Sequence, residues 1–144
     1  MIAAAFLAVC IGASPALAGT SPNDPLYFHQ WYAQKLGWEH AASRIMGLEL
    51  PVIAVLDSGV SQLTPDLAGR VLPPISTSGF GPFDEDQLRG SVLAHGTWVA
   101  GSIAMMPDNG IGGAGVAPFT ILPITVTDAA MSNPSGAAID QGIR

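Results

Sequence analysis

The sequence predicts an α/β fold with a parallel β-sheet that this chain leaves incomplete. Residues 51–56 and 119–127 are apolar or β-branched runs of strand length, as expected of strands buried on both faces. Residues 95–106 and 135–144 follow these runs and are predicted helices. Strand, turn, helix, strand and helix in this order are typical of a parallel sheet covered by helices.

The remaining elements are shorter. Residues 27–42 are predicted as an irregular segment that leads into a short helix at residues 40–46. Residues 69–72 are a candidate second strand. The proline- and glycine-rich residues 73–94 then form a long irregular loop, and loops of that length in a compact domain are usually functional or mobile. Three strands leave sheet edges and one sheet face uncovered, so we expect the chain to be part of a longer domain.

Composition excludes several classes of protein. Of the 144 residues, 49% are hydrophobic and 11% are charged, with a net charge of −6. Such an apolar chain is not a disordered acidic tail, and its negative charge argues against binding nucleic acid. The single cysteine, Cys10, excludes an internal disulfide framework and any multi-thiolate metal site.

Residues 1–18 are predicted to be a signal peptide. The apolar run Ile2–Ile11 is shorter than the roughly 20 residues that span a bilayer, and Ala16 and Ala18 form a signal-peptidase pattern. No basic residue precedes the run, which leaves a buried N-terminal helix or an uncleaved anchor as alternatives. We expect a secreted or periplasmic protein that meets the membrane only through this leader.

Two residues are candidates for chemistry. Asp57 directly follows the strand at 51–56, where functional groups gather in open α/β sheets, although such an aspartate can equally cap a turn. His95 begins the predicted helix at 95–106, where the helix dipole disfavours the imidazolium form. A carboxylate partner would offset that effect and fix the tautomer, giving an oriented general base. Asp57 is the natural partner.

One motif is misleading. Residues 110–115 match the letters of the dinucleotide-binding pattern G-x-G-x-x-G. That pattern functions where a strand ends and a helix begins, whereas here it follows a predicted helix and leads into a strand. We therefore expect no nucleotide partner, although a nucleotide-dependent α/β enzyme remains a weak alternative.

Several segments together resemble subtilisin-like serine proteases (subtilases). The segments that carry the resemblance are Val55–Val60, Pro65–Leu67, His95–Gly101 and Gly115–Pro118, with Asn23-Asp24-Pro25 and Trp31 as in the thermitase-like branch. The resemblance covers residues 24–144 and implies a three-layer α/β sandwich with a parallel sheet. It also implies a serine endopeptidase acting on proteins or peptides, with Asp57 and His95 as the triad aspartate and histidine.

The resemblance further implies a structural calcium ion as cofactor. The matching ligands are the carboxylates of Asp24 and Asp66, the amide oxygen of Asn109, and the backbone carbonyls of Met106, Ile111 and Gly113. Such an all-oxygen set suits Ca²⁺. A plain turn around Asn109 and a helix cap at Asp66 are the alternatives.

The chain departs from the family pattern in lacking its nucleophile. The Gly-Thr-Ser motif that carries the family's serine does not occur in this sequence, and the oxyanion-hole asparagine would also lie after Arg144. We therefore expect residues 19–144 to be the N-terminal portion of a peptidase domain, inactive alone and a monomer. The alternative is a catalytically inactive subtilase-like module that binds or scaffolds.

Overall fold

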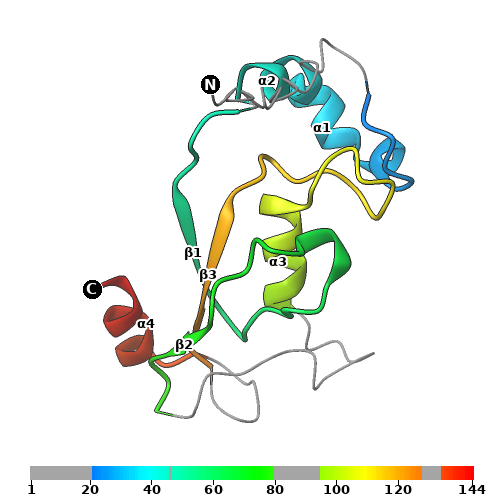
Figure 1. Cartoon of the computed structure of the whole chain (residues 1–144). Helices are drawn as coiled ribbons and strands as arrows, with labels where there is room; N and C mark the ends of the chain where they lie inside the picture. Colours follow the sequence, from blue (N-terminus) through cyan, green and yellow to red (C-terminus); the bar gives the residue numbers. More distant parts are fainter. Residues whose placement is uncertain (1–20, 46, 80–94, 128–133) are drawn as a thin grey trace, which may run out of the picture.

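A computed structural model describes residues 21–45, 47–79, 95–127 and 134–144. The predicted signal peptide lies outside these residues, so it stays a prediction. The described part contains a three-stranded parallel sheet in the order β1-β3-β2 (Figure 1). Its strands are β1 (Val52–Asp57), β2 (Ile75–Ser76) and β3 (Thr120–Thr125). The parallel α/β architecture predicted from the sequence is confirmed.

The central strand β3 fixes the register of the sheet. It pairs with β1 along the whole length of both strands, from Val52 opposite Thr120 to Asp57 opposite Thr125. On its other side β3 pairs only with the two residues of β2. The strands therefore end together, and Asp57 lies at the carboxyl edge of the sheet.

Helices cover both faces of the sheet, which gives three layers. Helix α3 (His95–Ala104) packs on one face, in a core that includes Val55 of β1 and Ile121 of β3. Helix α4 (Gly136–Ile143) packs on the other, where Ala138 contacts a cluster that contains Ile124. Alternate residues of the strands face opposite sides, so strands buried on both faces read as continuous apolar runs in the sequence.

The N-terminal segment forms a separate layer of short helices above the sheet (Figure 1). It contains the 3-10 helix η1 (Tyr27–His29), α1 (Trp31–Leu36) and α2 (Trp38–Ile45). Its contacts are with the loop that follows α3. The indole N–H of Trp38 donates to the Gly115 carbonyl at 2.7 Å, and the Gln30 side chain both donates to and accepts from the backbone of Ala114 at 2.8 Å.

Two shorter predictions are wrong in detail. The strand expected at residues 69–72 is a single bridge between Val71 and Ile121, followed by β2. Pro73 and Pro74 directly follow and have no N–H to continue a ladder. The helix expected at residues 40–46 begins instead at Trp38, after α1 has ended at Gly37 in a left-handed conformation (φ 67°). A further 3-10 helix, η2 (Pro65–Leu67), lies between β1 and β2.

No helix within the described ranges is long and apolar enough to cross a membrane.

Candidate active site

The last residue of β1 and the first residue of α3 bring together the two predicted catalytic side chains. His95 Nδ1 lies 3.0 Å from Oδ1 and 2.9 Å from Oδ2 of Asp57. Because an ionised carboxylate only accepts hydrogen bonds, Nδ1 carries the proton and Nε2 is left to exchange one. The Asp57 side chain is 17% exposed and that of His95 is 66% exposed. The carboxylate is therefore shielded, while the imidazole is open to solvent.

The turn after β1 holds the carboxylate in place. Asp57 Oδ1 accepts hydrogen bonds from the backbone N–H of Ser58 at 2.8 Å and from its hydroxyl at 3.0 Å. The Ser58 hydroxyl in turn accepts from the backbone N–H of Gly96 at 3.3 Å. Asp57 thus caps a turn and also contacts a histidine, and its catalytic role stays a prediction.

Ser58 is a positioning residue that sequence reasoning missed. It is buried and links the turn after β1 to the start of α3. The sequence feature that could have identified Ser58 is its position between Asp57, at the end of a predicted strand, and the turn at Gly59. Its hydrogen bonds to Asp57 and Gly96 place it on the carboxylate side of the histidine, where it cannot serve as the nucleophile activated by Nε2.

Close packing of α3 against this turn depends on Gly96. A Cβ atom at Gly96 would overlap the carbonyl oxygen of Gly59 and lie 3.1 Å from the Cβ of Asp57. Gly59 itself has φ 130°, a conformation that residues with side chains rarely adopt. One residue further on, the Thr97 hydroxyl accepts from the backbone N–H of Ser61 at 2.8 Å. The two glycines allow the close backbone contact, and the hydrogen bond of Thr97 to Ser61 stabilises it.

Asp66 is the best-placed of the predicted calcium ligands. It is buried at 5% exposure. Its carboxylate accepts hydrogen bonds from Asn109 Nδ2 at 2.8 Å and from the backbone N–H of Gly113 at 3.2 Å. Its backbone carbonyl accepts from the N–H of Met106 at 3.1 Å. Four of the six predicted ligand residues therefore meet around this loop.

Asn109 does not present its oxygen to Asp66. Its Oδ1 accepts from the N–H of Ile111 at 2.8 Å, which turns the amide NH₂ group toward the carboxylate. No described residue donates a hydrogen bond to the carbonyl oxygens of Met106, Ile111 or Gly113. Those three predicted ligand atoms therefore have no protein donor in the described part of the chain.

Asp24 lies beside the same loop but faces a different set of groups. Its carboxylate, buried at 4% exposure, accepts from the backbone N–H groups of Asp108, Asn109 and Gly110 at 2.9–3.1 Å. Within the described ranges, no three His, Cys, Asp or Glu side chains stand close enough to hold a metal ion. The structure thus brings Asp24 to the loop without joining it to Asp66 in one ligand shell.

Asp108 is an acidic residue of this loop that sequence reasoning missed. Its Oδ1 accepts from the backbone N–H of Asn23 at 3.0 Å, while its Oδ2 is buried and lacks a hydrogen-bond partner among the described residues. Its φ of 61° is in the left-handed region, which aspartate tolerates better than most residues. Only a turn signal in the sequence pointed to this position.

The Gly110–Gly115 run lies in the loop that leads from α3 into β3, as the sequence predicted, and no helix begins at its end. Its glycines serve packing. A Cβ at Gly112 would overlap Asp66 Oδ2, and one at Gly115 would lie 2.5 Å from the backbone nitrogen of Met105.

Comparisons with known proteins all indicate the same family. The profile of the Subtilase family matches residues 50–144. Thermitase of Thermoactinomyces vulgaris is 34% identical over 133 residues, covering 86% of this chain and 46% of the relative. A thermophilic serine proteinase of Bacillus sp. (strain AK1) is 35% identical over 125 residues, covering 85% and 29%. Fervidolysin of Fervidobacterium pennivorans is 39% identical over 97 residues, covering 63% and 12%. The chain spans less than half the length of each of these relatives.

Proposed function

This chain belongs to the subtilase family, and we propose that it supplies the aspartate and histidine of a serine endopeptidase triad. The single observation that carries the proposal is the contact between Asp57 and His95 Nδ1 at the carboxyl end of β1. Membership of the family supports peptidase activity in general. The assignment of these two residues rests on their geometry.

The geometry suits general acid–base catalysis. With Nδ1–H held by Asp57, Nε2 of His95 removes the proton from a serine hydroxyl as that oxygen attacks the peptide carbonyl. The imidazolium formed is stabilised by the Asp57 carboxylate, and it then protonates the leaving amine. Because the imidazole is open to solvent while the carboxylate is shielded, a polypeptide substrate can approach the histidine without displacing its partner.

The nucleophile is assigned to the part of the protein that follows Arg144. The serine next to the pair, Ser58, is occupied by Asp57 and Gly96. The chain also covers only 46% of thermitase and 29% of the Bacillus relative. We therefore place residues 19–144 in a longer peptidase domain and expect this portion alone to be inactive, monomeric and without a catalytic serine.

Casein hydrolysis by the full-length protein tests this function. His95→Ala is expected to lower the rate by roughly 10⁴-fold or more, as for loss of a triad base. His40→Ala is the matched control, since His40 is exposed on α2, which precedes the amino end of β1, whereas Asp57 is the last residue of that strand. Equal activity of wild type and His95→Ala would refute the assignment. Absence of hydrolysis in the wild type would favour the alternative, an inactive binding module.

The loop after α3 supports a structural calcium ion as part of the same proposal. Asp24 and Asp66 are buried carboxylates, and within the described ranges neither forms an ion pair with a basic side chain. Carbonyl oxygens of Met106, Ile111 and Gly113 accept no hydrogen bond from described residues, and Asp108 Oδ2 is an unpartnered buried oxygen. Oxygen donors of this kind suit Ca²⁺. Asn109 would join them only after its amide turned away from Ile111.

Secretion completes the proposed function. One relative is described as a halolysin-like extracellular serine protease, from Natrialba magadii, and is 33% identical over 104 residues. The predicted signal peptide at residues 1–18 is consistent with export of this protein as well. Its substrates are then proteins or peptides outside the cytoplasm.

A further inference from the structure

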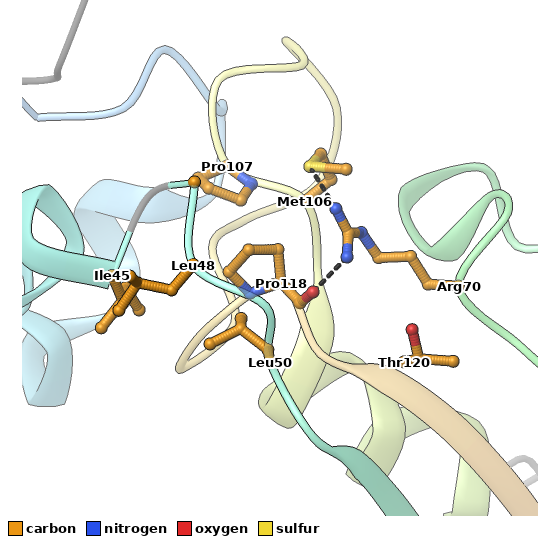
Figure 2. Close-up of a pocket in the computed structure, with 9 residues that line it drawn as sticks. Ile45, Leu48, Leu50, Arg70, Met106, Pro107, Pro118 and Thr120 are labelled. Atoms are coloured by element: carbon orange, nitrogen blue, oxygen red, sulfur yellow. Dashed lines mark hydrogen bonds between the residues drawn. The ribbon is translucent and has the colours of Figure 1, made fainter.

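A cavity lies at the opposite end of the sheet from Asp57 and His95. It encloses about 330 Å³ beside the amino ends of β1 and β3 (Figure 2). Leu50, just before β1, and Pro118 and Thr120, at the start of β3, form its floor. Ile45 and Leu48 line the side facing α2. The strands run from this cavity toward the catalytic pair, so the two sites are at opposite edges of the sheet.

Among the described residues, Arg70 is the one charged residue that lines this cavity. Its guanidinium points toward Pro118 and Met106, donating through Nη1 to the Pro118 carbonyl and through Nη2 to the sulfur of Met106 at 3.5 Å (Figure 2). A thioether sulfur is a weak acceptor. The third donor of the fork, Nε, is buried and has no hydrogen-bond partner among the described residues. The guanidinium is therefore poorly satisfied by the groups around it.

The charge of Arg70 is also uncompensated. Among the described residues, carboxylates form ion pairs only with His95 and Arg144, and none with Arg70. Burial lowers the pKa of Arg70, which reflects the loss of solvation around the charged group. Arg70 is half-buried, so its charge has lost part of its hydration, and an anion placed beside it offsets that loss.

From these observations, the geometry points to a binding site for an aliphatic carboxylate at Arg70. A planar carboxylate matches the guanidinium fork and would accept the N–H groups of Nη1 and Nη2 that Pro118 and Met106 leave without an acceptor among the described residues. The apolar side chains of Leu48, Leu50 and Ile45 offer contacts for a short branched hydrocarbon group. A single cation in a chain of net charge −6 compensates a monoanion better than a phosphate dianion.

Such a carboxylate has two sources, a free short-chain acid or the C-terminal end of a peptide. Thr120 supplies a hydroxyl that Figure 2 shows on the side of the residue facing Arg70. A hydroxyl can donate to the second carboxylate oxygen or to a peptide carbonyl. Isovalerate represents the free acid, and N-acetylleucine represents a peptide C-terminus.

The Arg70 Nε–H resonance of the full-length protein reports directly on this site. Titration with isovalerate and with N-acetylleucine is expected to shift it saturably, with a Kd on the order of 1 mM for a ligand of this size. Stronger binding of one ligand identifies the source of the carboxylate. Isovaleramide, the uncharged isostere of isovalerate, is expected to leave the resonance unchanged.

Substitutions at Arg70 and at a control arginine distinguish specific carboxylate binding at this cavity from a general effect of the positive charge. Arg70→Gln is expected to abolish binding and Arg70→Lys to weaken it about tenfold, because lysine keeps the charge but loses the fork. Arg44→Gln removes the same charge from an exposed position on α2 and is expected to bind normally. If Arg70→Gln does not fold, the titration of the wild-type protein with the two acids and isovaleramide still tests the proposal.

Two results would contradict the proposal that Arg70 binds a carboxylate. One is an Nε–H resonance that neither acid shifts at concentrations on the order of 50 mM. The other is an equal shift with isovaleramide, which would show that the cavity recognises the hydrocarbon group and not the carboxylate.

Discussion

Asp57 shows how one side chain serves the structure and the chemistry together. Its Oδ1 accepts two hydrogen bonds from Ser58, while both of its oxygens lie within 3.0 Å of His95 Nδ1. The side chain at position 57 must therefore accept hydrogen bonds both from Ser58 and from His95. The tautomer of the histidine follows directly from that requirement.

Asp57→Asn tests this role. With Oδ1 held by Ser58, the amide NH₂ group would face Nδ1 and force the proton onto Nε2, where a base is needed. We expect kcat of the full-length protein to fall roughly 10⁴-fold, as for the same change in a well-characterised serine-protease triad. Asp140→Asn, which removes an exposed carboxylate paired with Arg144, should leave kcat unchanged. A loss of less than tenfold in Asp57→Asn would contradict the assignment.

Tyr27 gives a second prediction, on stability. Burial first, and then the charge and hydrogen bond of Glu39, raise the pKa of Tyr27 from 10.0 to about 12. The folded state thus keeps the phenol proton more tightly than the unfolded state. Its contribution to stability is complete below about pH 10 and is lost as pH rises toward about 12.

The free energy of unfolding across that pH range checks the Tyr27 prediction. Tyr27→Phe should be less stable than wild type below pH 10, because it loses the bond to Glu39, and the difference should shrink as pH rises. Tyr32→Phe, at an exposed position, is the matched control. A difference between Tyr27→Phe and wild type that stays constant with pH would contradict this.

At the scale of elements, the site depends on how closely α3 approaches the turn after β1. The contact is made through Gly96 and Gly59, and both of the side chains proposed as catalytic lie at its edge. Because backbone meets backbone there, no flexible side chain can absorb an added atom. The spacing of the catalytic pair is therefore set by two glycines.

Gly96→Ala should separate α3 from this turn. Its new Cβ would overlap the Gly59 carbonyl, and we expect a loss of about 1–3 kcal/mol of stability together with most of the activity. Gly101→Ala, in the same helix, would meet only the Met105 side chain at 3.5 Å or more, so it should be neutral or slightly stabilising. Thermal unfolding of both variants provides the measurement, and equal stability would show that the turn can move aside.

The elements also show what the sequence could predict. β1 and β3 were predicted to within a few residues, because each is a continuous apolar or β-branched run, although β3 is mostly buried while β1 buries only Val55. The strand predicted at residues 69–72 is only an isolated bridge, because its pairing depends on a residue that is distant in the chain. Asp57 and His95 were identified by their places at a strand end and a helix start. Ser58 and Asp108 were missed, since their roles follow from hydrogen bonds formed only in the fold.

At the scale of the whole molecule, the loop after α3 connects the N-terminal segment to the core. Asp24 binds the backbone of residues 108–110, Leu26 donates to the Gly112 carbonyl at 2.7 Å, and Asp66 binds the same loop from η2. The carboxylates of Asp24 and Asp66 thus both contact this loop, and neither forms an ion pair with a basic side chain among the described residues. A bound cation would stabilise all three segments at once.

Calcium removal tests that connection. EDTA should lower the Tm of the full-length protein, since a ligand at a hundredfold excess over its Kd contributes about 3 kcal/mol. Asp66→Ala should abolish the effect of EDTA. Glu49→Ala removes an exposed carboxylate outside the loop and should retain it. A wild-type Tm that does not change with EDTA would count against the ion.

If Asp57 and His95 belong to a triad, its nucleophile comes from the rest of the protein, since none lies beside His95 Nε2 within the described residues. Labelling the full-length protein with a fluorophosphonate, followed by mass-spectrometric mapping of the modified residue, tests this most directly. We predict a single labelled serine after Arg144, with labelling abolished in His95→Ala and retained in His40→Ala. A label on Ser58, or undiminished labelling of His95→Ala, would contradict the account.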